Sequence, residues 1–295
     1  MLYYIHGGGF FGGSPDVVEE SVKMFVEKTD LCAVSVDYRL APENPYPVGH
    51  RDCYQVLKWI CSNADTLHVK PEQVFVDGDS AGGNLTQYCT TRSWEDGTYL
   101  VKGQLLLYLN MAGIKDEYFN PGMDQFEMAP KQKRGLSKMI GMFGGMTTGL
   151  KPILGTDDVK NDYLNPYTRD ASKNSPTFLT VGEHDFLKIE TLGYGVKLHN
   201  AGVETQIVLY KGFGHAFLIT QGFIPSVRTV LRKWENLFSA TVDKAGKGRL
   251  KCLISMNFKT AKERKMQTRF FMNVVCGIFF QKSGSHILSE AIGWI

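Results

Sequence analysis

Short apolar runs alternate with longer amphipathic runs along the first 110 residues. Strand-like runs are found at 2–5, 31–36, 74–76 and 104–109, and helix-like runs at 16–27, at 52–61 and from residue 83. The helical run at 52–61 places Cys53, Val56, Leu57 and Ile60 on one face, as packing against a sheet requires. Strands that alternate with helices predict a mostly parallel sheet flanked by helices, an α/β fold.

The alternation is interrupted and then resumes. Residues 112–165 contain methionines, glycines and the basic run "KQKR", so we expect a cap insertion of short helices over the sheet. Strand-like runs then follow at 177–181 and 205–210, and helical runs near 188–200 and 225–238. A chain of 295 residues with 43% hydrophobic content can bury a substantial core. We therefore expect one α/β domain over 1–243.

The remaining residues, 244–295, form a basic tail. They hold ten Lys and Arg against two Asp and Glu, a local charge of +8, which leaves 23 minus 28, or −5, for the rest of the chain. The tail shows no regular apolar periodicity and no motif that would organise it for nucleic acid. We expect no nucleic-acid partner, and we expect removal of the tail to leave the midpoint of unfolding nearly unchanged.

The sequence also bears on compartment and cofactors. No basic region followed by an apolar run and a small-residue cleavage site is seen, which favours a cytoplasmic protein. The apolar stretch at 270–280 has about half the roughly 20 residues that a membrane-spanning helix needs, so no span is expected. Six cysteines occur without a CxxC pair, which is typical of reduced thiols and not of a zinc site. No metal or other cofactor is predicted.

Gly78-Asp79-Ser80-Ala81-Gly82 has the pattern G-x-S-x-G and lies between a strand and a helix. A sharp turn at that place strains the central residue, and glycine two positions away on each side prevents clashes. The central hydroxyl then projects from the edge of the sheet. Ser80 is the candidate nucleophile.

A serine hydroxyl is a weak nucleophile near neutral pH and needs a histidine base. His215 lies in the glycine-containing stretch "YKGFGHAF" just after the strand-like run 205–210, where a side chain reaches the carboxyl edge of the sheet. His184 and His199 are the rivals. His199 falls within a predicted helix, and His184 adjoins the candidate acid, so His215 is preferred.

The base needs a carboxylate that orients it and stabilises the imidazolium. "TFLTVGEHDFL" presents Glu183 and Asp185 directly after the strand-like run 177–181. Thirty residues separate Asp185 from His215, enough for a helix and a strand that return the chain to the same edge. Asp185 is the candidate acid, and Glu183 stays as the alternative.

The glycine run in "YYIHGGGFFGG" follows the first strand-like run. Glycines there allow backbone amides to point at one small anion. In acyl transfer the carbonyl oxygen becomes such an anion, and donors fixed beforehand supply about 3–4 kcal/mol each. The amides of Gly8 and Gly9, with Gly7 as a further candidate, and of Ala81 form the predicted oxyanion hole.

Taken together, "HGGGF", "DYRLAPE", "GDSAGGN", "HDFL" and "GFGHAF", in this order and spacing, resemble the hormone-sensitive-lipase-like α/β-hydrolases, a group that includes bacterial carboxylesterases and arylacetamide deacetylase. The resemblance covers about residues 1–240. It implies the α/β-hydrolase fold, a triad of Ser80, Asp185 and His215, and cofactor-free hydrolysis of small-molecule carboxylic esters. It also implies that Arg39 and Glu43 are structural neighbours of the site.

The sequence departs from that family pattern in several places. Only one short strand-like run precedes "HGGG", so the chain looks as if it lacks the first strands and the N-terminal cap. We therefore expect an open site that prefers short acyl chains, while an inactive or truncated hydrolase-like binding protein stays as the alternative. Asp77 stands within a strand, where an ionised carboxylate is costly unless it is paired or hydrated. "LNMAG" follows "QLLLY" without the expected proline.

Overall fold

The computed structural model describes residues 1–29, 31–111, 130, 133–135, 137, 146–159, 161–220, 253–257 and 271–273. Its strands are β1 (Leu2–Ile5), β2 (Ala33–Asp37), β3 (Phe75–Asp79), β4 (Gly103–Leu107), β5 (Thr177–Gly182), β6 (Thr205–Tyr210), β7 (Leu253–Asn257) and β8 (Phe271–Asn273). Its longer helices are α1 (Pro15–Thr29), α2 (Val48–Ser62), α3 (Ala81–Glu95), α5 (Met146–Leu154) and α6 (Lys188–Asn200).

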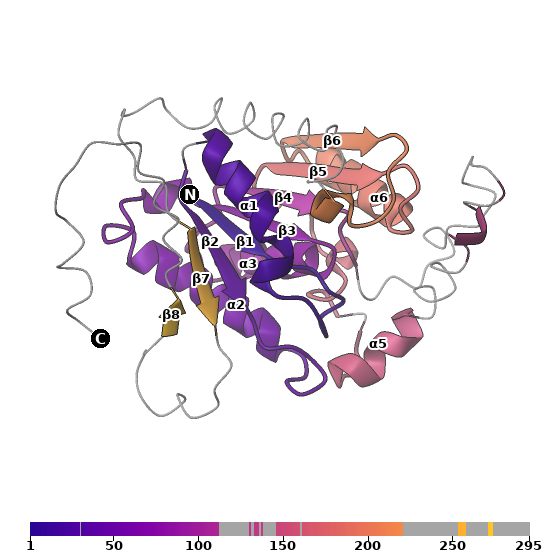
Figure 1. Cartoon of the computed structure of the whole chain (residues 1–295), viewed down its shortest axis with the longest axis horizontal. Coiled ribbons are helices and arrows are strands. Elements are labelled where there is room, and N and C mark those ends of the chain that lie inside the picture. The colour runs from indigo at the N-terminus through magenta and orange to yellow at the C-terminus, as the bar shows by residue number, and fades with distance from the viewer. Residues whose placement is uncertain are drawn as a thin grey trace.

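These strands form one sheet in the order β6-β5-β4-β3-β1-β2-β7-β8 (Figure 1). Strands β1 to β6 pair in parallel with their neighbours. The connections between them pass through helices, because parallel neighbours need crossovers of a dozen or more residues. The predicted α/β fold, with a mostly parallel sheet and flanking helices, is confirmed.

The helices cover both faces of the sheet. On one face, Val22 and Phe25 of α1 pack against Leu2 and Tyr4 of β1. On the other face, α2 and α3 pack against the alternate residues of β1 and β2, and α6 packs against β4 and β5. The four residues expected on the inner face of α2, Cys53, Val56, Leu57 and Ile60, are all buried. Each fully buried aliphatic side chain contributes about 1.5–3 kcal/mol.

Asp77 is an unusual residue for the central strand β3. Its side chain is fully buried, and neither carboxylate oxygen has a hydrogen-bond partner among the described residues. Burial, and after it the charge of Asp79, raises the pKa of Asp77 well above its ordinary value. The direction of this pKa shift follows from the cost of placing an unpaired charge in the protein interior.

Part of the basic tail extends the sheet. Strand β7 pairs in parallel with β2, from Ala33↔Leu253 to Asp37↔Asn257, and β8 pairs with β7 in the antiparallel direction. Without β7, β2 would present unpaired backbone groups along one edge. This pairing argues against the expectation that the tail contributes nothing to stability. It escaped sequence analysis because a non-local pairing leaves no periodic pattern in the sequence.

Two further expectations concern segments that the structure covers only in part. Helix α5 lies within the predicted insertion 112–165, most of which falls outside the described residues. The helix predicted near 225–238 lies wholly outside them. In the described part of the chain, no helix combines the length and the apolar character needed to cross a bilayer.

Candidate active site

Ser80 lies at the turn between β3 and α3, with φ 54° and ψ −116°. A non-glycine residue in this region is strained by about 1–3 kcal/mol. The flanking glycines are required by close contacts. A Cβ on Gly78 would lie 2.2 Å from the carbonyl oxygen of Gly82, and a Cβ on Gly82 would lie 2.0 Å from that of Ile5 in β1. The G-x-S-x-G spacing thus lets α3 approach β1 while Ser80 projects from the sheet edge.

His215 joins Ser80 to Asp185. Nε2 of His215 lies 3.1 Å from Oγ of Ser80, and Nδ1 lies 3.0 Å from each carboxylate oxygen of Asp185. Asp185 is fully buried, and its Oδ1 also accepts the backbone N–H of Leu187 at 2.8 Å. With Nδ1 protonated and donating to Asp185, Nε2 is free to accept the hydroxyl proton of Ser80. The three residues follow the carboxyl ends of β3, β5 and β6.

The alternative base and acid lie elsewhere. The backbone N–H of His184 donates to the carbonyl of Phe213, and its ring lies 3.8 Å from the carboxylate of Glu183. His199 is exposed on α6. Oε2 of Glu183 accepts the N–H of Gly212 at 2.8 Å, three residues before His215. Glu183 therefore holds the loop that carries the histidine and does not contact the histidine itself.

Two aromatic side chains that sequence analysis did not single out pack on His215. The rings of Tyr108 and Phe186 have their centroids 4.9 Å and 4.5 Å from that of the imidazole. Tyr108 follows β4 with a positive φ of 39°, and Phe186 follows the candidate acid directly. In the sequence, Tyr108 is marked only by its place just after a strand, and Phe186 only by its place just after Asp185. They limit the ring orientations open to His215.

The glycine loop after β1 approaches the same strand end. The N–H of Gly7 donates to Oδ1 of Asp79 at 2.8 Å, so this amide is already used within the protein. Gly8 and Gly9 have φ of 120° and 63°. A Cβ on Gly8 would lie 2.1 Å from the carbonyl of Gly12, so only glycine fits there. Ala81 begins α3, where the first backbone amides of a helix have no partner within it.

Asp79, the residue before Ser80, connects these parts. Its Oδ1 accepts the hydroxyl of Tyr4 at 3.1 Å as well as the N–H of Gly7. Burial raises the pKa of Asp79, while the hydrogen bond from Gly7 and the nearby His6 oppose that rise. A Cβ on Gly7 would lie 2.5 Å from Oδ2 of Asp79. Asp79, the middle residue of "GDS", thus positions the glycine loop. The motif alone does not reveal this role.

Arg39 and Glu43 have different surroundings. Nε and Nη2 of Arg39 donate to the two carboxylate oxygens of Asp52 at 2.8 and 2.6 Å, a bidentate pair that fixes the loop before α2. Glu43 is exposed. Among the described residues, no group of three or more His, Cys, Asp or Glu side chains is placed to hold a metal ion.

Comparison with known proteins adds to this geometry. A model of the alpha/beta hydrolase fold family matches residues 2–219. The carboxylesterase NlhH of Mycobacterium tuberculosis is 31% identical over 210 residues, which make up 70% of this chain and 63% of that protein. The esterase LipI of the same species is 27% identical over 77% of this chain and 68% of its own. The chain thus spans less than two thirds of the length of NlhH.

Solved structures give the same result. A hyperthermophilic esterase from Pyrobaculum calidifontis has a TM-score of 0.71 at 28% identity, covering 81% of this chain and 76% of its own. The carboxylesterase EstE1, cloned from a metagenomic library, has a TM-score of 0.69 at 28% identity, covering 81% and 79%. The chain therefore belongs to the alpha/beta hydrolase fold family, and its similarity to these esterases agrees with the expected resemblance to the hormone-sensitive-lipase-like members of that family.

Proposed function

We propose that this chain hydrolyses carboxylic esters of small molecules with Ser80 as nucleophile, His215 as base and Asp185 as the acid that orients it. The observation that carries the proposal is the hydrogen-bonded line from Ser80 through His215 to Asp185. Three separate segments of the chain meet there, and a structural role for a strained serine at that point is hard to find.

In the first half of the reaction, Oγ of Ser80 attacks the carbonyl carbon of the ester while its proton passes to Nε2 of His215. Asp185 stabilises the resulting imidazolium through Nδ1. When the tetrahedral intermediate collapses, the bond to the alkoxy oxygen breaks, and the proton on Nε2 goes to the departing alcohol. The acyl group stays on Ser80 as an ester.

The negative charge on the carbonyl oxygen needs donors that are already in place. We assign this role to the amides of Gly8, Gly9 and Ala81, since the amide of Gly7 is bonded to Asp79. Each such donor supplies about 3–4 kcal/mol of transition-state stabilisation. In the second half of the reaction, water attacks the acyl carbon, its proton goes to Nε2 of His215, and Ser80 recovers the proton as the acid leaves. No cofactor takes part.

The proposed substrates are esters with short acyl chains. The relatives named above are described as carboxylesterases or esterases, which supports small-molecule esters. Each methylene that a site buries adds about 0.8 kcal/mol, so a chain that extends beyond the site gains little from further length. p-Nitrophenyl acetate and butyrate should exceed the decanoate in kcat/KM. A maximum at ten carbons or longer would contradict this preference.

The test is fluorophosphonate labelling of the purified full chain together with a turnover assay. Labelling should be lost in Ser80→Ala and kept in Ser62→Ala, a matched change at an exposed serine of α2. Ser80→Ala and His215→Ala should each lower ester turnover on the order of 10³-fold or more, because nucleophile and base act as a unit. Near-parental turnover in a folded Ser80→Ala variant would overturn the proposal. A wild-type chain that neither labels nor turns over esters would instead be a hydrolase-like binding protein.

A further inference from the structure

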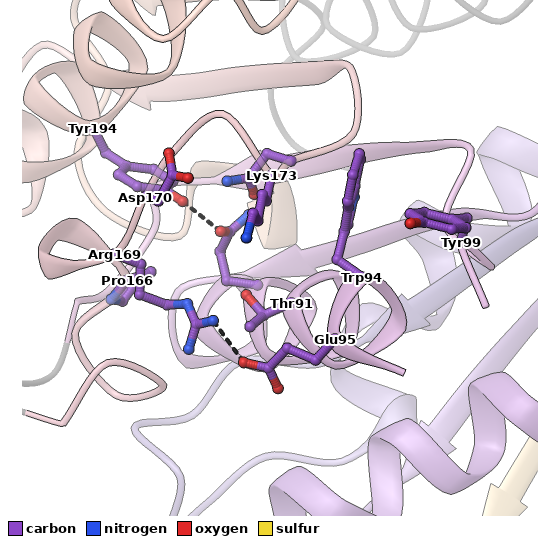
Figure 2. A pocket seen from close by; sticks show the side chains of 11 residues that line it. Thr91, Trp94, Glu95, Tyr99, Pro166, Arg169, Asp170, Lys173 and Tyr194 are labelled. Atoms are coloured by element: carbon purple, nitrogen blue, oxygen red, sulfur yellow. Dashed lines mark hydrogen bonds and ion pairs between the residues drawn. The ribbon is translucent and has the colours of Figure 1, made fainter. Parts of the chain in front are cut away.

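A pocket lies at the end of α3 that is remote from Ser80. It has a volume of about 430 Å³ and is lined by the last turns of α3, the segment around Tyr99 and residues 166–174 (Figure 2). Small-molecule sites in proteins commonly measure about 300–1,000 Å³. The pocket is therefore large enough for one small ring-shaped ligand.

This pocket is separate from the proposed active site. Ser80 precedes the first residue of α3, whereas Trp94 and Glu95 are its last two residues. At a rise of about 1.5 Å per residue, the two ends of the helix lie roughly 20 Å apart. Tyr99 and Asn174 precede the amino ends of β4 and β5, while the triad follows carboxyl ends of strands. A ligand in this pocket leaves the reacting serine accessible.

One wall of the pocket is an aromatic platform. Trp94 contacts Tyr99 edge to face, with ring centroids 4.8 Å apart and planes at 88°. Tyr99 remains 60% exposed. In Figure 2 the ring of Trp94 stands between Tyr99 on one side and Lys173 on the other, and all three residues line the pocket. The indole thus offers an apolar face to a ligand that enters beside Lys173.

The opposite side of the pocket is polar, and its charges are held in place. Arg169 donates to Oε1 of Glu95 at 2.6 Å, and Oε2 of Glu95 accepts the hydroxyl of Tyr163 at 2.7 Å. Arg169 also lies over the ring of Tyr163, 5.1 Å from its centroid. Asp170 accepts the N–H and the hydroxyl of Ser172 at 3.0 and 2.7 Å. These internal bonds hold the polar groups in place, and a carboxylate oxygen can accept a further hydrogen bond from a ligand.

The inner side of the pocket is formed by a network of buried amides. Gln87 is 1% exposed, donates through Nε2 to Gln104 at 2.5 Å and accepts the hydroxyl of Tyr194. Gln104 in turn donates to Thr177 at 2.7 Å and to Asn174 at 3.3 Å. A ligand that reaches this side meets polar groups that are already ordered, so little side-chain entropy is lost on binding.

The chemistry of these walls selects a class of ligand. The pocket is lined by two cations, Arg169 and Lys173, and by two carboxylates, Glu95 and Asp170. Their formal charges sum to zero, so a phosphate or carboxylate ligand gains no net electrostatic attraction. Sugar hydroxyls both donate and accept hydrogen bonds, which matches the mixture of donors and acceptors. The C–H face of a pyranose ring fits against an indole face. We propose that this pocket binds a neutral sugar ring, independently of ester hydrolysis.

The experiment uses the full chain and ligand-detected NMR titration with methyl pyranosides of glucose, galactose, mannose and xylose. At least one should bind saturably with a millimolar Kd. Trp94→Ala should weaken that binding at least tenfold, whereas Trp59→Phe, a change at a tryptophan of α2, should not. Asp170→Ala should weaken it several-fold, and Asp157→Ala, at another exposed carboxylate, should not. Ser80→Ala should leave it unchanged.

Three results would overturn the proposal. One is the absence of saturable binding by every pyranoside. A second is binding that persists unchanged in Trp94→Ala and Asp170→Ala, which would place the sugar elsewhere. The third comes from titrating indole and inorganic phosphate in the same way: saturation by either of them in place of the sugars would assign another ligand class. Because Ser80 takes no part, loss of esterase activity and loss of sugar binding are distinguishable outcomes.

Discussion

Asp79 contributes to the site through the backbone of Gly7, and its removal tests that role. Asp79→Ala leaves the N–H of Gly7 and the buried hydroxyl of Tyr4 without their common acceptor, so the glycine loop loses its position. Because small misplacements are costly in catalysis, kcat should fall about 10- to 100-fold while KM changes little. Asp79→Asn keeps one carbonyl acceptor and should retain more activity. Equal kcat values for wild type and Asp79→Ala would show that the loop holds its geometry unaided.

His50 gives a residue-scale prediction about pH. It is buried among Phe10, Tyr46 and Tyr88, and its Nε2 lies 3.2 Å from Oδ1 of Asn84. Burial lowers the pKa of His50 from 6.5 to about 4. The unfolded chain therefore binds this proton more readily than the folded chain, and stability is lost as the pH falls from 6.5 towards 4. That loss amounts to about 1–3 kcal/mol.

Thermal unfolding at several pH values checks this prediction. His50→Phe, which cannot titrate, should show a shallower fall of the unfolding midpoint between pH 6.5 and 4.5 than the wild type. His199→Gln, at an exposed histidine of α6, should follow the wild-type curve. An identical pH dependence in His50→Phe and wild type would rule out His50 as the source.

At the scale of elements, the contact between α3 and β1 depends on Gly82. A Cβ there would lie 2.0 Å from the backbone oxygen of Ile5, and a strand cannot yield as a flexible side chain would. Gly82→Ala should cost about 1–3 kcal/mol or more in unfolding free energy, because overpacking forces backbone shifts. Gly135→Ala, where the added Cβ has no atom within 4 Å, is the control and should unfold near the wild-type midpoint. Chemical denaturation of both variants measures the difference, and wild-type stability in Gly82→Ala would contradict the assigned contact.

Strand β7 supports a second element-scale prediction. Ser255 pairs with Ser35 of β2 on one side and with Asn273 of β8 on the other, so its N–H faces a paired strand whichever way it points. Ser255→Pro removes that donor and should lower the unfolding midpoint and the amide-exchange protection of β2. Ser255→Ala keeps the backbone N–H and is the matched control for the proline variant. Unchanged protection of Ala33–Asp37 in the proline variant would mean that β2 does not depend on β7.

Over the whole molecule, the sequence predicts the structure where the decisive constraint is local. The glycines around Ser80 and the alternation of strands and helices are short-range patterns, and they predicted the sheet and which residues come together at its edge. Tyr108 and Phe186 were missed because their contact with His215 depends on how loops from different strands pack. The Gly7–Asp79 bond and the β2–β7 pairing were missed because each joins residues that are far apart in the chain. The roles of Ser80, His215 and Asp185 in catalysis stay predictions.

The bond between Gly7 and Asp79 joins residues 72 positions apart in the chain. It has a consequence for how the protein fails under denaturing conditions. The glycine loop after β1 and the turn at Ser80 cannot be assembled separately, since each needs the central strands to be in register. We therefore expect no partly unfolded form to keep half of the site, so the proposed ester turnover and far-UV circular dichroism should decline along a single denaturation curve. Enzymatic activity would then serve as a reporter of cooperative folding of the central sheet.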